Sequence, residues 1–239
     1  QRPHGRRHDF ARAPTGALHF GRVAVARTFL CRIDLKTRPR AGFFVSGVLI
    51  VTIRHFLSTQ DWSRVELDAL LKQAAAFKHS KVGTQLAGKS IALLFFNPSM
   101  RTRTSFELGA FQLGGHAVVL QPGKDAWPIE FDVGTVMDGE AEEHVAEVAR
   151  VLSRYVDLIG VRAFPRFQDW AVDREDRVIR AFAKYATVPV INMETITHPC
   201  QELAHILALQ QHFGTPDLHG KKYVLTWTYH PKPLNTAVA

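Results

Sequence analysis

Apolar positions recur along residues 61–239 with two spacings that alternate. Stretches with an apolar residue every three or four positions predict amphipathic helices, and short continuous apolar runs predict buried strands. This pattern predicts helices over 61–79, 101–113, 141–154, 172–186 and 199–213, and strands over 90–97, 116–120, 157–163 and 188–193. Strands that alternate with helices in this way are typical of an α/β fold with a doubly wound parallel sheet. A last apolar run from Lys221 would begin a second α/β domain.

The strand predicted over 90–97 runs directly into the helix predicted over 101–113. Ser99 is a preferred N-cap residue, and Arg101 and Arg103 fall in the first turn, where the helix dipole disfavours a cation. Two arginines there favour an anion bound at the free N–H groups, and phosphate meets that demand best. A solvated basic helix start is the alternative. The glycine spacing of Walker and dinucleotide-binding loops is absent from the sequence.

A second polar pair stands at the start of the helix predicted over 199–213. His198 and Gln201 place an imidazole and an amide together, and these groups can bind a small planar amide such as a carbamoyl group. His198, His205, His212 and His219 also recur every seven residues. Seven residues rise about 10.5 Å along a helix, so no two of these imidazoles could share a metal ion. The sequence therefore predicts no metal site.

Two motifs resemble those of one enzyme family. The S-x-R-T-R run at 99–103 and the HPCQ at 198–201 closely resemble the carbamoyl phosphate site of the aspartate and ornithine carbamoyltransferases. The stretches GKDAWPIEF, NMETITHPCQELAH and LTWTYHPKPLNTAVA resemble the branch that acts on N-acetylornithine, with enzymes acting on N-succinylornithine as near relatives. The resemblance runs from about residue 54 to 239 and is specific, because two separate motifs occur in the right order.

The resemblance implies an activity and a set of site residues. The activity is transfer of the carbamoyl group of carbamoyl phosphate to the δ-amino group of N-acetyl-L-ornithine, as in arginine biosynthesis, without a cofactor. Carbamoyl phosphate would be bound by Ser99, Met100, Arg101, Thr102, Trp127, Arg162, His198 and Gln201. Of these, the catalytic side chains would be Arg101, Arg162 and His198. N-acetylornithine would be bound by Glu194, His230 and Lys232.

Some of these roles rest on the resemblance alone. Arg162, at the end of a predicted strand, would by itself indicate a strand-end salt bridge, and Trp127 would by itself indicate a core residue. The resemblance instead implies that Trp127 enters the site of a neighbouring subunit in a homotrimer. Glu142 and Glu143 are either a charged first helical turn or part of an acyl pocket. In a pocket, a carboxylate would repel the extra charge of a succinyl group and favour acetyl.

The charge of the chain divides at residue 54. Residues up to Arg54 hold 11 Lys and Arg against 2 Asp and Glu, and the remainder holds 19 against 20. The first methionine is Met100, so we favour translated upstream sequence for the basic part over a transit peptide or a nucleic-acid-binding arm. We expect four segments: a disordered or non-native extension 1–53, a carbamoyl phosphate-binding domain 54–198, a linking helix 199–219, and the start of a truncated amino-acid-substrate domain 220–239.

Other classes of function are disfavoured by the sequence. The apolar run at 42–53 is shorter than the roughly 20 residues that span a bilayer, and no aromatic platform accompanies the arginines. Two cysteines offer no disulfide framework, and a cytoplasmic location fits best. Three hypotheses remain: an active carbamoyltransferase for N-acetylornithine, N-succinylornithine or ornithine; a truncated fragment that only binds carbamoyl phosphate; and a basic-tailed nucleic-acid binder.

Overall fold

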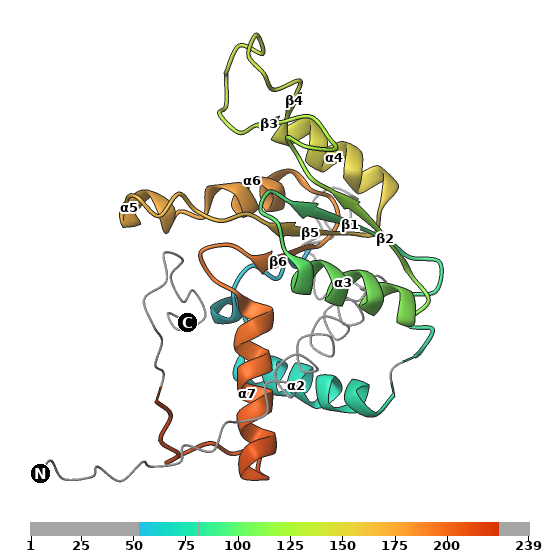
Figure 1. The fold of residues 1–239 in the computed structure, drawn as a ribbon, viewed down its shortest axis with the longest axis vertical. Helices are drawn as coiled ribbons and strands as arrows, with labels where there is room; N and C mark the ends of the chain where they lie inside the picture. Colours follow the sequence, from blue (N-terminus) through green and yellow to red (C-terminus); the bar gives the residue numbers. More distant parts are fainter. Residues whose placement is uncertain (1–52, 81, 225–239) are drawn as a thin grey trace, which may run out of the picture.

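The computed structural model of the chain describes residues 53–80 and 82–224. Within them, four parallel strands form the central sheet in the order β2-β1-β5-β6. These strands are β1 (Ser90–Phe95), β2 (His116–Leu120), β5 (Leu158–Arg162) and β6 (Val190–Glu194). Helices lie on both faces of the sheet (Figure 1). The predicted α/β fold with a doubly wound parallel sheet is therefore confirmed.

In the described part of the chain, five longer helices make up the outer layers (Figure 1). One face of the sheet is covered by α2 (Arg64–His79), α3 (Met100–Gln112) and α7 (Pro199–Phe213). The other face is covered by α4 (Val145–Tyr155) and α6 (Arg177–Tyr185). The short elements are the 3-10 helix η1 (Thr59–Asp61), α5 (Trp170–Asp173), and the strands β3 (Ile129–Glu130) and β4 (Glu143–His144), which pair with each other.

Strand β1 divides the hydrophobic core into two halves. Successive side chains of a strand point to opposite faces of its sheet. Ile91, Leu93 and Phe95 pack in the cluster with α2, α3 and α7, whereas Ala92 and Leu94 pack in the cluster with α4 and α6. A strand buried on both faces needs an apolar residue at every position. This requirement explains why the continuous run SIALLF predicted the strand correctly.

Three predicted helices have different bounds in the structure. The helix predicted over 61–79 begins only at Arg64, after the 3-10 helix η1. The helix predicted over 141–154 begins only at Val145, after the short strand β4. The helix predicted over 172–186 is wrong as one element, because Asp176 adopts a left-handed backbone (φ 46°, ψ 47°) and separates α5 from α6. The pairing of β3 with β4 was not predicted.

Several predictions fall on segments that the structure does not describe. His230, Lys232 and the basic extension up to residue 52 lie outside the described residues. Of the apolar run predicted to open a second domain, residues 221–224 are described and form neither helix nor strand, and 225–239 lie outside the described part. Within residues 53–80 and 82–224, no helix combines the length and apolar character needed to cross a membrane.

Candidate active site

Polar side chains gather where β1, β5 and β6 end. Ser99 precedes α3 just after β1, Arg162 is the last residue of β5, and Glu194 is the last residue of β6. His198, the N-cap of α7, follows β6 after a short connection. Ligands of open α/β sheets bind beyond the carboxyl ends of the strands, at the point where the strand order reverses. Here that point lies between β1 and β5.

The N-terminus of α3 has the features of an anion site. The Ser99 side chain accepts a hydrogen bond from the Thr102 main-chain N–H at 3.1 Å, which confirms the predicted N-cap. The first turn holds no acidic residue. Arg103 pairs with Glu107 along the helix at 3.1 Å, whereas no ion pair of Arg101 exists within the described residues. The positive end of the helix dipole and the Arg101 charge therefore lack a protein counter-charge in the described part of the chain.

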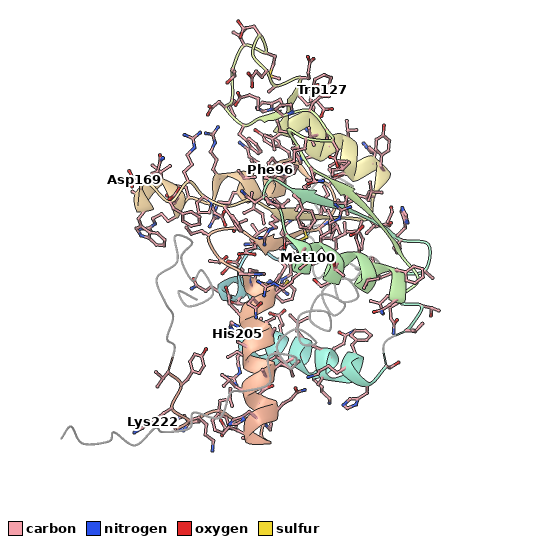
Figure 2. All side chains as sticks on the ribbon, viewed as in Figure 1. Phe96, Met100, Trp127, Asp169, His205 and Lys222 are labelled. Atoms are coloured by element: carbon pink, nitrogen blue, oxygen red, sulfur yellow. The ribbon has the colours of Figure 1, made fainter. Side chains whose placement is uncertain are left out.

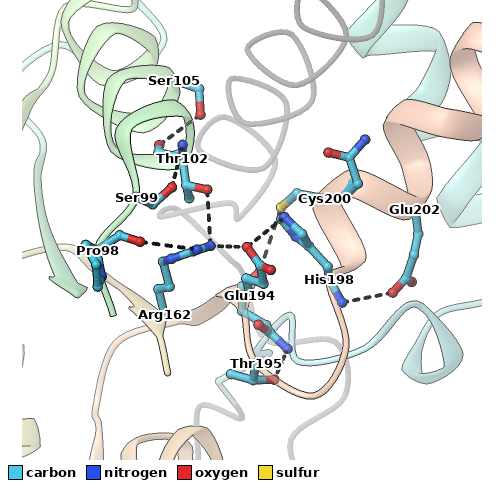
Figure 3. A network of polar contacts seen from close by, with 12 residues as sticks. Pro98, Ser99, Thr102, Ser105, Arg162, Glu194, Thr195, His198, Cys200 and Glu202 are labelled. Carbon is cyan, nitrogen blue, oxygen red and sulfur yellow. Dashed lines mark hydrogen bonds and ion pairs between the residues drawn. The ribbon is translucent and has the colours of Figure 1, made fainter. Parts of the chain in front are cut away.

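Arg162 connects this helix start to β6 (Figure 3). Its guanidinium is buried, forms an ion pair with the Glu194 carboxylate, and donates to Thr102 Oγ1 at 3.4 Å. It also donates to the Pro98 carbonyl at 3.4 Å and lies 4.5 Å from the Phe164 ring centroid. The Arg162 Nε has no hydrogen-bond partner among the described residues. Arg162 therefore makes a strand-end salt bridge, as the alternative predicted, and also keeps one donor for a ligand.

Glu194 lies between two basic side chains. Its Oε2 accepts from Arg162 and lies 3.2 Å from His198 Nε2. A register shift in the pairing of β5 with β6 places Arg162 opposite Glu194; in regular pairing Met193 would stand there. Such irregularities redirect side chains near functional sites. Glu194 therefore joins the arginine of β5 to the histidine of α7.

Burial sets the electrostatics of this group. Burial is the largest effect and lowers the pKa of Arg162, and the Arg101 charge lowers this pKa further. The Glu194 carboxylate acts in the opposite direction and raises it. A guanidinium stays protonated in proteins despite such shifts. The Arg101 charge thus acts on the Arg162 guanidinium, and an oxyanion at the start of α3 would be stabilised by both charges.

His198 and Gln201 stand together at the start of α7, as predicted. Both side chains are buried. Gln201 Nε2 lies 2.9 Å from His205 Nε2, so His205 is a partner of the site. The Gln201 Oε1 has no hydrogen-bond partner among the described residues. It is therefore positioned to accept from the amino group of a carbamoyl ligand.

The seven-residue recurrence of histidines does not continue along one helix as far as His219. Helix α7 ends at Phe213, so His219 is not part of it. Within the described part of the chain, no three or more His, Cys, Asp or Glu side chains are grouped so that they could hold a metal ion.

Glu202 is a site contributor that the sequence did not reveal. Its carboxylate accepts from the His198 main-chain N–H at 3.0 Å and from Thr59 Oγ1 at 2.9 Å. It thus ties the residue that carries the imidazole to η1. A glutamate near the start of a helix has a local explanation in the helix dipole, so only the structure identifies this contact.

Replacing Glu202 by glutamine should alter the pH dependence of stability. Burial raises the pKa of Glu202, although the bonds from Thr59 and His198 oppose this. The folded chain therefore binds more protons than the unfolded chain. The contribution of Glu202 to stability falls as the pH rises from about 4, the pKa of an unfolded glutamate, to the raised pKa of the folded chain. The glutamine side chain keeps an acceptor oxygen and cannot ionise. Urea unfolding between pH 4 and 8 should show the variant gaining stability relative to the unaltered chain; a pH-independent difference would contradict this.

Trp127 and the two glutamates lie away from this group. Trp127 is 61% exposed, and Figure 2 draws it far from Met100 at the start of α3. The alternative that Trp127 is a core residue is therefore wrong. Glu142 and Glu143 are exposed and precede α4, so the alternative that they form its first turn is also wrong. Met100 itself is 83% exposed beside the α3 N-terminus.

Comparison with known proteins agrees with this geometry. Residues 54–211 match the family model described as aspartate/ornithine carbamoyltransferase, carbamoyl-P binding domain. An N-acetylornithine carbamoyltransferase of Xanthomonas campestris pv. campestris is 82% identical over 189 residues, which cover 79% of this chain and 56% of that protein. An N-succinylornithine carbamoyltransferase of Bacteroides thetaiotaomicron is 37% identical over 167 residues, covering 70% of this chain and 51% of that protein.

A solved structure extends the agreement to three dimensions. The crystal structure of an acetylornithine transcarbamylase complexed with acetylcitrulline matches with a TM-score of 0.74 and 83% identity, covering 77% of this chain and 55% of that one. The chain thus spans about half the length of the curated relatives it matches. The two motifs, the parallel sheet and the matched domain together show that this chain belongs to the aspartate/ornithine carbamoyltransferase family.

Proposed function

We propose that this chain forms the carbamoyl phosphate-binding part of an enzyme that carbamoylates the δ-amino group of N-acetyl-L-ornithine. The products are N-acetyl-L-citrulline and phosphate. The observation that carries the proposal is Arg162: a buried guanidinium that contacts Thr102 of α3 and Glu194 of β6, with its Nε unpaired among the described residues. One side chain can thereby reach both the phosphate and the carbonyl of a ligand between these elements.

The phosphate would be bound at the N-terminus of α3. The main-chain N–H groups of Met100 and Arg101 supply donors there, and the Ser99, Arg101 and Thr102 side chains add to them. The Thr102 main-chain N–H is already bonded to Ser99 Oγ. The exposed Arg101 and the buried Arg162 supply the counter-charge. Binding a dianion between two cations also favours the leaving group, because negative charge builds on the phosphate as its bond to carbon breaks.

The carbamoyl group would lie towards α7. Thr102 and Arg162 donate to its carbonyl oxygen, and His198 adds a third donor beside Glu194. Gln201 accepts from its amino group. Such preorganised donors stabilise the oxyanion of the tetrahedral intermediate, and loss of one typically raises the barrier by about 3 kcal/mol.

The transfer itself is an addition followed by an elimination. The neutral δ-amine attacks the carbonyl carbon, and its new C–N bond replaces the C–O bond to phosphate. The amine loses one proton, which the departing phosphate can accept. Proximity of the two substrates supplies much of the rate. Glu194, together with His230 and Lys232, is proposed to bind the amino-acid substrate.

The preference for acetyl over succinyl is assigned to the segment before α4. Glu142 and Glu143 are both exposed there. A carboxylate at the acyl pocket repels the second carboxylate of N-succinylornithine and leaves the neutral acetyl group unaffected. The greater likeness to the N-acetylornithine enzyme supports the same choice.

Shared sites in a homotrimer are the proposed quaternary arrangement. Trp127 is exposed on the connection between β2 and β3, and Figure 2 draws it well away from Met100 at the start of its own α3. A tryptophan presented to solvent in this way supports a contact with a neighbouring subunit, where its large ring would be buried.

Formation of the ureido product tests the proposal. The purified chain is assayed with carbamoyl phosphate and N-acetylornithine, N-succinylornithine or ornithine, alone and mixed with the C-terminal half of the Xanthomonas relative. We expect N-acetylornithine to be carbamoylated at least about 100-fold faster than the others. Preference for another amine would contradict the assignment. Because the chain spans about half the length of its relatives, a second candidate is a fragment that only binds carbamoyl phosphate; turnover only in the mixture would support it.

A further inference from the structure

Asp176 stands at the N-cap of α6 but does not cap it. Aspartate is among the best N-cap residues because its carboxylate accepts from the free N–H groups of the first turn. The Asp176 side chain makes no such bond. Its backbone is also left-handed, with φ 46° and ψ 47°, a conformation that costs free energy for any residue with a Cβ atom. A residue that keeps a left-handed backbone and gives up its capping hydrogen bond must be held by contacts with another part of the fold.

The constraint lies in the segment 195–197. Thr195 Oγ1 donates to the Asp176 carboxylate at 2.6 Å, and the Ile196 main-chain N–H donates to the same group. Thr195 is fully buried and accepts from Asn192 Nδ2 at 2.8 Å. Hydrogen bonds therefore run in one direction, from amide to hydroxyl to carboxylate. Such chains polarise one another and fix the groups that they join.

This segment joins two residues of the candidate active site. Glu194 precedes it and His198 follows it, and the two side chains meet at 3.2 Å (Figure 3). Glu202 fixes the His198 end through the His198 main-chain N–H. Asp176, which comes from the layer of α4 and α6, binds the middle of the segment 195–197 through Thr195 and Ile196. The turn is also held from within, because Asn192 Nδ2 donates to the Thr195 and Thr197 hydroxyls at 2.8 and 3.2 Å and the Thr195 main-chain N–H donates to the Thr197 carbonyl at 2.8 Å. Asp176 adds an anionic acceptor from a different layer to this network.

We propose that Asp176 is a positioning residue: its carboxylate holds Thr195 and Ile196 so that His198 and Glu194 keep the spacing needed to bind the carbamoyl group. The inference rests on the proposed function, because it assigns His198 to the carbamoyl end of the ligand. It also predicts that the phosphate and carbamoyl groups of the ligand depend on Asp176 to different extents. The phosphate is bound at α3, which Asp176 does not touch in the described contacts, so only the carbamoyl contribution to binding depends on Asp176.

Two substitutions separate the carboxylate from the backbone strain. Asp176→Gly removes the carboxylate and accepts the left-handed backbone without strain. Asp176→Asn keeps an oxygen that can accept from Thr195 and Ile196. Asp169→Gly is the matched control, because Asp169 caps the neighbouring helix α5 through the Ala171 main-chain N–H at 2.8 Å.

The measurement is calorimetric binding of two ligands to the chain, inorganic phosphate and phosphonoacetamide, a stable analogue of carbamoyl phosphate. Asp176→Gly should weaken phosphonoacetamide binding by about 10-fold or more, since small misplacements of binding groups cost this much. Phosphate binding should stay within about twofold, and Asp176→Asn should recover most of the loss. Asp169→Gly should change neither ligand. Thermal unfolding of every variant accompanies the titrations.

Each outcome decides the inference. Equal weakening of both ligands, together with a lower unfolding temperature, would mean that Asp176 is only structural and would overturn it. If Asp176→Gly still prefers phosphonoacetamide over phosphate as strongly as the unaltered chain does, the inference is overturned as well. The proposed function would not be affected by that result. If the unaltered chain binds both ligands equally, the proposed function fails and the inference fails with it.

Discussion

Replacement of Arg162 by leucine is expected to abolish carbamoyl phosphate binding and to lower the free energy of unfolding by about 3–5 kcal/mol. Both effects follow from burial. Arg162 and Glu194 are 5% exposed each, so removal of the guanidinium leaves the Glu194 carboxylate without its cationic partner in the interior. The same substitution removes the donor proposed to reach both phosphate and carbonyl. Urea unfolding and calorimetric titration with phosphonoacetamide measure the two effects.

A double substitution separates the two roles of Arg162. Combined with Glu194→Gln, Arg162→Leu should recover much of its lost stability, because no buried charge then remains unpaired. Binding should not recover. Recovery of binding along with stability would show that Arg162 acts only by maintaining the fold. The single variant Glu194→Gln completes the double-mutant cycle and must also be measured, because the effects of neighbouring substitutions are not additive.

Replacement of Trp127 by alanine should reduce carbamoyl transfer by about 100-fold and leave the free energy of unfolding within about 0.5 kcal/mol. The side chain is 61% exposed, so its own subunit loses little packing. In the proposed trimer, the substitution removes the indole ring from the active site of the neighbouring subunit. Steady-state rates and urea unfolding, measured in the preparation that shows turnover, test both parts.

Mixing of variants tests whether sites are shared. Arg101→Ala removes a phosphate contact, and Trp127→Ala removes a contact proposed to come from the next subunit. Random reassembly of the two inactive variants should restore about a quarter of the sites, namely those with an intact Arg101 from one chain and an intact Trp127 from another. Activity that stays at the level of the separate variants would mean that both residues act within one subunit.

The local features of the site were predictable from the sequence. Ser99 caps α3 through a contact three residues away, and His198 and Gln201 share one helical turn. Such arrangements depend on sequence neighbours alone. The buried face of α3 depends on the same local spacing: Phe106 and Ala110 within the helix and Leu113 at its C-cap recur every three or four residues, and all three are buried.

The remaining features depend on contacts between distant segments. Arg162 and Glu194 are 32 residues apart and meet because of a register shift that no sequence pattern marks. The break at Asp176 was missed because no glycine or proline interrupts residues 172–186. The carboxylate of Asp176 is directed towards Thr195, 19 residues away, so the break reflects tertiary structure. Helical propensity is overridden by tertiary contacts of this kind.

A crystal structure of the chain with phosphonoacetamide tests the central claim most directly. We predict the phosphonate at the α3 N-terminus, within hydrogen-bond distance of the Met100 and Arg101 main-chain N–H groups and of the Arg162 guanidinium. We predict the amide between His198 and Gln201. A phosphonate bound elsewhere, or an amide directed away from α7, would contradict the assignment of this site to carbamoyl phosphate.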